Sequence, residues 1–155
     1  MAITQFYHVS LCVADLARSV AFYRDVLGLR VAGEFDFAGP EIGRVLAVGD
    51  CRVKAAFLSR DGLRLELLAF ERPATLPPGE SAANNRIGLA HLTFSVDDLD
   101  ATLQSLRDRG VSILSETRAE LGPGVAACSV RDPDGLLIEL FQHPAGVASP
   151  YDAVD

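Results

Sequence analysis

The chain has 155 residues, of which 49% are hydrophobic and 23% charged, so a single domain or two very small modules with a real apolar core are expected. Its 14 Lys and Arg against 21 Asp and Glu give a net charge of −7, which argues against nucleic acid or a membrane surface as a partner. The three cysteines are odd in number, and the sequence shows neither a signal peptide nor an apolar run of about 18 residues, so a cytoplasmic protein without disulfides is predicted.

The sequence contains an internal repeat that divides it into two halves. The pattern H-x-[ST]-x-x-V-x-D-L begins at His8 and again at His91, a shift of 83 residues. The pattern D-G-L-x-[LI]-E-L begins at Asp61 and again at Asp134, a shift of 73 residues. Two matches in the same order predict two related modules in tandem.

The first module is predicted to have the order β-α-β-β-β. Residues 7–13 alternate between apolar and polar side chains, which is typical of a strand. Asp15 then stands where a helix N-cap belongs, and Gly28 is placed to end that helix. Three further strands are expected at Gly43–Val48, Arg52–Leu58 and Leu63–Phe70.

The second module is predicted to repeat this order. The strand His91–Val96 is followed by Asp98 as the N-cap of a helix that ends near Gly110. Its later strands are expected at Val111–Glu116, Val125–Arg131 and Leu136–Gln142. In both modules an Asp-Gly pair predicts a hairpin between the last two strands.

The fold class is therefore α+β, with two tandem β-α-β-β-β modules in one domain spanning 1–155. Module one is expected over 4–70 and module two over 87–143. The segment 71–86 is rich in proline and lacks periodicity, so it is interpreted as a linker, and 144–155 as a tail.

The repeat places a histidine on the first strand of each module and a glutamate on the last. These residues are His8, Glu66, His91 and Glu139. Each glutamate interrupts an apolar run, where an unpaired buried carboxylate costs several kcal/mol. A divalent cation shared with the histidines is a suitable partner, and this donor set suits Zn, Ni, Co, Mn or Fe.

The chain resembles the vicinal oxygen chelate superfamily in the segments FYHVSLCVADLARSVAFYRDVLGL, LRLELLAF, IGLAHLTFSVDDLDATLQSLRDRGV and VRDPDGLLIELFQ. That group includes glyoxalase I, methylmalonyl-CoA epimerase, extradiol dioxygenases, fosfomycin-resistance enzymes and bleomycin-binding proteins. The resemblance implies that the paired modules curl into a half-open barrel around one metal per chain. It also implies that the ligand positions fall on His8, Glu66, His91 and Glu139, and that the protein is a homodimer.

The four ligand positions favour glyoxalase I and the epimerase within this group. They imply a lyase, isomerase or epimerase that abstracts a proton next to a metal-bound carbonyl through an enolate or enediolate, with Glu139 or Glu66 as the base. Glu41 is a further candidate base, although a solvated loop acid is the preferred interpretation. An Fe(II) ring-cleaving dioxygenase is an alternative, with Glu66 as a bystander. A metal-free binding or resistance protein is another, against which His8 and His91 count.

The substrate is expected to be a small molecule whose identity the sequence leaves open. Strand parity and apolar character suggest a set of residues for its pocket, although Cys12 is interpreted first as a small buried hydrophobe. The predicted pocket residues are Ser10, Cys12, Phe57, Arg64, Leu68, Thr93, Leu137 and Phe141.

Overall fold

The computed structural model describes residues 3–77, 87–144 and 146–147. The chain divides into two units, Met1–Pro78 and Gly79–Asp155, and the division falls within the predicted linker. The linker residues 78–86 and the tail residues 145 and 148–155 lie outside the described residues. Among the helices of the described part, none is long and apolar enough to cross a membrane.

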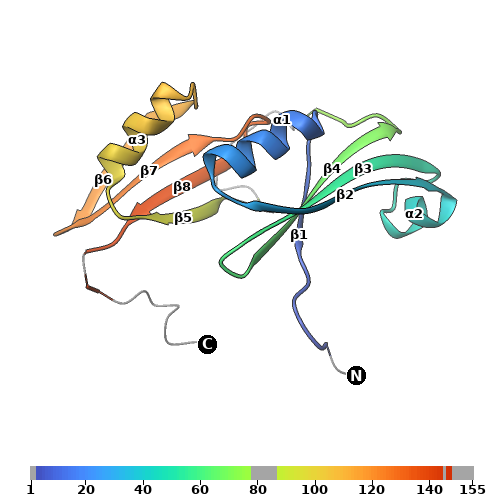
Figure 1. Cartoon of the computed structure of the whole chain (residues 1–155), viewed down its shortest axis with the longest axis horizontal. Helices are drawn as coiled ribbons and strands as arrows, with labels where there is room; N and C mark the ends of the chain where they lie inside the picture. Colours follow the sequence, from blue (N-terminus) through green and yellow to red (C-terminus); the bar gives the residue numbers. More distant parts are fainter. Residues whose placement is uncertain (1–2, 78–86, 145, 148–155) are drawn as a thin grey trace. The chain divides into compact units, whose positions relative to one another are not determined.

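The first unit is a four-stranded sheet with two short helices (Figure 1). The strands run in the order β1-β4-β3-β2, with β1 parallel to β4 and the other pairs antiparallel. A π-helical segment, Phe22–Val26, continues α1 directly. The bounds are β1 Val9–Cys12, α1 Leu16–Ala21, β2 Arg30–Gly39, α2 Pro40–Val45, β3 Cys51–Arg60 and β4 Leu63–Arg72.

The second unit repeats this topology, with the strands in the order β5-β8-β7-β6 (Figure 1). Again the first and last strands of the unit, β5 and β8, pair in parallel. The bounds are β5 Leu92–Val96, α3 Leu99–Asp108, β6 Ile113–Gly122, β7 Val125–Arg131 and β8 Leu137–Gln142. The α+β class and the two tandem modules are thereby confirmed.

The helix starts follow from local chemistry that the sequence displays. A side-chain oxygen of Asp15 accepts a hydrogen bond from the backbone N–H of Arg18 at 3.0 Å, and Asp98 accepts one from Ala101 at 2.9 Å. Each bond satisfies one of the backbone donors that a helix N-terminus leaves without an intrahelical partner. Both predicted N-caps are confirmed.

The alternation along β4 separates a core face from a site face. Leu65 and Leu67 are 1% and 0% exposed, and α1 contacts both β3 and β4. Arg64 and Glu66 therefore point to the opposite face of the sheet, because successive strand residues alternate sides. This arrangement leaves the glutamate on the face that the helix α1 does not cover.

The predicted strand Gly43–Val48 is wrong. Residues 40–45 form helix α2, and the second strand lies earlier, at Arg30–Gly39. Pro40 occupies the first helical turn, where its fixed φ and missing N–H cost nothing. Gly43 packs so closely on the next turn that a Cβ there would lie 1.2 Å from the Gly49 carbonyl oxygen. A short apolar run cannot by itself distinguish a strand from such a helix.

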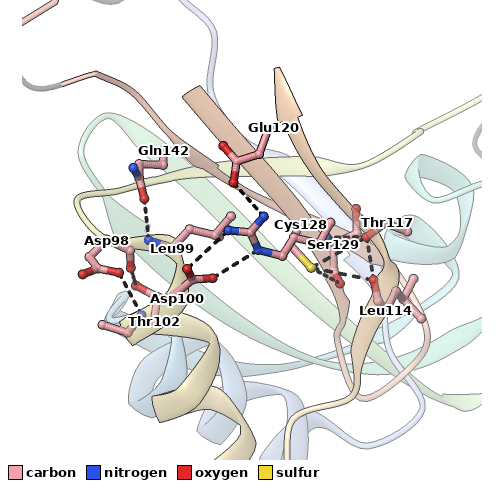
Figure 2. A network of polar contacts seen from close by, with 12 residues as sticks. Asp98, Leu99, Asp100, Thr102, Leu114, Thr117, Glu120, Cys128, Ser129 and Gln142 are labelled. Carbon is pink, nitrogen blue, oxygen red and sulfur yellow. Dashed lines mark hydrogen bonds and ion pairs between the residues drawn. The ribbon is translucent and has the colours of Figure 1, made fainter. Parts of the chain in front are cut away.

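The predicted strand Val111–Glu116 also differs from the observed one in its bounds, because β6 begins at Ile113 and continues to Gly122. Its register with β7 shifts between Leu114 and Ala119. Figure 2 shows how this irregularity is held: the Thr117 hydroxyl donates to the Leu114 carbonyl at 2.7 Å and accepts from the Ser129 N–H at 2.8 Å. The side chain replaces ladder hydrogen bonds that the bulge removes.

Polar contacts of the same network connect the start of α3 to the sheet (Figure 2). The side-chain oxygen of Gln142, at the end of β8, accepts from the Leu99 N–H at 2.7 Å. Arg118 on β6 donates to Asp100 at 3.1 Å and to Glu120 at 2.7 Å. Three elements of the second unit are thus tied together where its helix begins.

Candidate metal and active site

The parallel pairing of β1 with β4 brings the first half of the candidate site together. Ser10 stands opposite Glu66 in the register. The Ser10 hydroxyl donates to Oε2 of Glu66 at 2.5 Å, and Nε2 of His8 lies 3.2 Å from the same oxygen. One carboxylate oxygen therefore faces both an imidazole nitrogen and a hydroxyl.

The second unit repeats this arrangement residue for residue. Thr93 stands opposite Glu139, and its hydroxyl donates to Oε2 at 2.9 Å. Nε2 of His91 lies 3.7 Å from that oxygen. The two H-x-[ST] patterns and the two glutamates therefore form two half-sites, each of which comprises one histidine, one hydroxyl and one carboxylate.

The half-sites differ in how far solvent reaches them. The side chain of Glu66 is 12% exposed, whereas that of Glu139 is 31% exposed. The Nδ1 atom of His8 is buried and has no hydrogen-bond partner among the described residues. A buried polar atom without a partner is uncommon and is typical of functional sites.

The donors of each half-site fit a divalent cation. Imidazole nitrogen and carboxylate oxygen bind such ions at about 2.0–2.2 Å, so two neighbouring ligands of one ion stand about 3.0–3.4 Å apart. The observed separations of 3.2 and 3.7 Å are close to this range. Within the described ranges no three His, Cys, Asp or Glu side chains form a group able to hold a metal. The structure brings the four predicted ligands together only in pairs, His8 with Glu66 in the first unit and His91 with Glu139 in the second.

A cavity of about 560 Å³ lies in the first unit beside His8. Of the predicted pocket residues, Phe57 and Arg64 line it. Ser10 contacts Glu66 instead, Cys12 is exposed rather than buried, and Leu68 belongs to a core cluster. The other members of that buried cluster are Cys51, Val53 and Ala55.

The predicted pocket residues of the second unit share the face of Glu139. Leu137 and Phe141 lie two positions to either side of it on β8, and Thr93 lies opposite it on β5. The Phe141 ring packs on His143 with a centroid separation of 4.7 Å. All three residues therefore border the second half-site.

Three aromatic residues that line the cavity were not predicted from the sequence. They are Tyr7, Phe35 and Phe37. The alternation of Phe35 and Phe37 was an available signal, because residues two apart on a strand face the same side. Glu41, the further candidate base, lies exposed on α2 and does not line this cavity.

Charged residues occupy the opposite face of β2 and β3 from these rings. Arg52 donates to the two carboxylate oxygens of Asp36 at 3.3 and 2.8 Å. These hydrogen bonds lower the pKa of Asp36, and the positive charge of Lys54 acts in the same direction. Glu71 on β4 forms ion pairs with both Arg52 and Lys54, and it raises the pKa of Lys54.

A family model described as the Glyoxalase/Bleomycin resistance protein/Dioxygenase superfamily matches residues 5–140. The chain belongs to this superfamily. A lactoylglutathione lyase of Haemophilus influenzae is 31% identical over 140 residues, covering 90% of this chain and 93% of the relative. A mitochondrial methylmalonyl-CoA epimerase of Bos taurus is 28% identical over 138 residues, covering 87% and 72% respectively.

A solved structure supports the fold independently. A glyoxalase family protein from Bacillus cereus superimposes with a TM-score of 0.81 at 25% identity, covering 93% of this chain and 97% of its own. The relatives named as lyase and epimerase perform different reactions. Membership therefore establishes the superfamily and leaves the individual reaction to be argued from the site.

Proposed function

We propose that this protein is a divalent-metal-dependent lyase, isomerase or epimerase that moves a proton on the carbon next to a substrate carbonyl. The observation that carries the proposal is the repeated half-site, in which Nε2 of a histidine faces a glutamate oxygen at 3.2 Å in one unit and 3.7 Å in the other. Similarity to a lactoylglutathione lyase and to an epimerase supports the same class.

His8, Glu66, His91 and Glu139 would hold the metal, which when bound supplies a Lewis acid for the carbonyl oxygen. Zn, Ni, Co, Mn and Fe all suit two imidazoles and two carboxylates. The hydroxyls of Ser10 and Thr93 orient the carboxylates by donating to them.

The proton is moved by one of the two glutamates. Glu139 is the better candidate in this structure, because its side chain is more exposed and its bond to Thr93 is longer than the Ser10–Glu66 bond. A carboxylate that is held less tightly exchanges more readily between holding and proton-transfer positions. We expect Glu66 to serve mainly in holding the site together.

A ring-cleaving dioxygenase is the second candidate, since the family description includes dioxygenases. It needs only three protein ligands, so Glu66 would be dispensable. A metal-free binding protein is the third. It gives no role to the repeated contact between histidine and glutamate.

The first experiment is elemental mass spectrometry of protein purified without an affinity tag, beside His91→Ala and Glu66→Ala variants. About one divalent metal per chain that both variants lose supports the four-ligand site. Iron lost only in His91→Ala favours the dioxygenase. No metal even after reconstitution refutes the proposal. Samples that contain metal are then assayed for hydrogen–deuterium exchange next to the carbonyl of 2-oxoaldehyde hemithioacetals and of 2-substituted thioesters.

We further propose that the protein is a homodimer, and mixing variants tests whether one chain or two complete a site. His8→Ala and His91→Ala proteins are unfolded together and refolded as a mixture. If each site combines the first unit of one copy with the second unit of another, about a quarter of the sites regain metal. If one chain supplies both half-sites, the mixture regains none.

A further inference from the structure

Five aromatic rings form a continuous wall beside the first half-site. Neighbouring ring centroids lie 5.3 Å apart for Tyr7–His8, 6.0 Å for His8–Phe57, 5.5 Å for Phe57–Phe35 and 5.8 Å for Phe35–Phe37. These separations are those of aromatic pairs that pack favourably. The wall therefore includes a candidate metal ligand, His8, and extends from it across β3 and β2.

The rings border a real cavity and are partly open to solvent. The cavity volume of about 560 Å³ lies within the range of volumes of pockets that bind small molecules. Tyr7 is 63% exposed and Phe35 is 51% exposed. Clustered exposed rings that line a hollow are characteristic of a ligand site rather than of an ordinary protein surface.

Arg64 supplies a cation at this wall. Its guanidinium carbon lies 5.8 Å from the centroid of the Tyr7 ring, within the distance of a cation–π interaction. No carboxylate of the described residues lies within ion-pair distance of Arg64, whereas Arg52, Arg60 and Arg72 in the same unit each contact at least one. Stacking orients the guanidinium and leaves its in-plane N–H groups available to an acceptor.

We propose that this pocket binds a substrate with one carboxylate on an aromatic or branched apolar body. The carboxylate pairs with Arg64, the body packs against Phe35, Phe37 and Phe57, and the reactive end reaches His8. A single guanidinium matches the two oxygens of a carboxylate in charge and shape. The statement that this ligand is the substrate rests on the proposed function. The statement that the pocket binds such a ligand does not depend on it.

Isothermal titration calorimetry of the full-length protein, as isolated, tests the charge requirement. The probes are 3-phenylpropanoate, its neutral analogue 3-phenylpropanamide, and acetate, which lacks the apolar body. We expect 3-phenylpropanoate to bind at least tenfold more tightly than either of the others, because each lacks one of the two recognised parts. Equal binding of the acid and the amide overturns the proposal, as does the absence of binding by all three.

Variants assign the effect to named residues. Arg64→Gln is expected to weaken 3-phenylpropanoate at least tenfold and to leave the amide unchanged. Arg72→Gln, on the same strand and with the same loss of charge, is the matched control and is expected to bind as the wild type does. Phe35→Leu weakens both probes. Equal effects of Arg64→Gln and Arg72→Gln refute the assignment, and circular dichroism confirms that each variant is folded.

Metal content measured on the same samples separates this inference from the proposed function. Probe discrimination by protein that takes up no metal even after reconstitution supports the pocket and refutes the metal-dependent enzyme. Bound metal without probe discrimination supports the enzyme and refutes the pocket.

Discussion

Removing the hydroxyl from each half-site is expected to weaken metal binding, and by different amounts. Ser10→Ala deletes a 2.5 Å hydrogen bond to Glu66, and Thr93→Val deletes a 2.9 Å bond to Glu139. A hydrogen bond to a charged group contributes about 1.5–3 kcal/mol, and loss of such a supporting bond typically weakens metal binding about 10–100-fold.

Solvent exposure decides which variant loses more. Glu66 is 12% exposed, so water cannot readily replace the lost donor, whereas at Glu139, which is 31% exposed, it can. We therefore expect Ser10→Ala to fall in the upper part of that range and Thr93→Val near about tenfold or below.

The assay is competition for Zn²⁺ between the full-length protein and a chromophoric chelator. Ser95→Ala is the matched control, because Ser95 shares the strand and face of Thr93 but stands opposite Phe141 rather than Glu139. Unchanged affinity in both hydroxyl variants, or the reverse order of their effects, refutes the reasoning about the half-sites.

Three further predictions concern stability, each measured by urea unfolding. Gly43→Ala is expected to cost more than about 2 kcal/mol, because its Cβ would meet the Gly49 carbonyl, while Glu41→Ala on the same helix changes little. Asp98→Ala removes the N-cap of α3 and is expected to lower the free energy of unfolding by about 1 kcal/mol. An unfolding free energy equal to that of the wild type would mean that the cap is redundant. Arg52 lowers the pKa of Asp36, so this carboxylate stabilises the fold above the unfolded-state pKa of about 4, and that contribution is lost as the pH falls. The deficit of Asp36→Asn should therefore shrink toward pH 3, and a constant deficit would contradict the assignment.

The features predicted correctly are those in which nearby residues determine the structure. Asp15 and Asp98 cap helices because their carboxylates reach backbone donors three residues ahead. The Asp61-Gly62 turn joins β3 and β4, with φ of +46° and +81° that suit these two residue types. Such local rules hold whatever the rest of the chain does.

The features that the sequence left undetermined depend on distant partners. Residues 43–48 are apolar enough for a strand, but the close approach of Gly43 to Gly49 and the packing of Ile42 on the sheet make this segment helical. The ring wall depends on the register of β2 with β3, which places Phe35 opposite Ala55. The alternation of Phe35 and Phe37 indicates that they share a face, but no local pattern specifies the register that places this face beside Phe57.

The repeat also separates what the two modules share from what they do not. Histidine, hydroxyl and glutamate recur at equivalent positions and make the same contacts in both units. At the position two residues before the glutamate, however, the first unit has Arg64 and the second has Leu137. A strand needs none of the three shared polar groups in order to pair, so their recurrence is best explained by a common chemical task. Under the proposed function, both modules would hold the metal, and the difference between Arg64 and Leu137 predicts that only the first module supplies a cation at this position to orient the substrate.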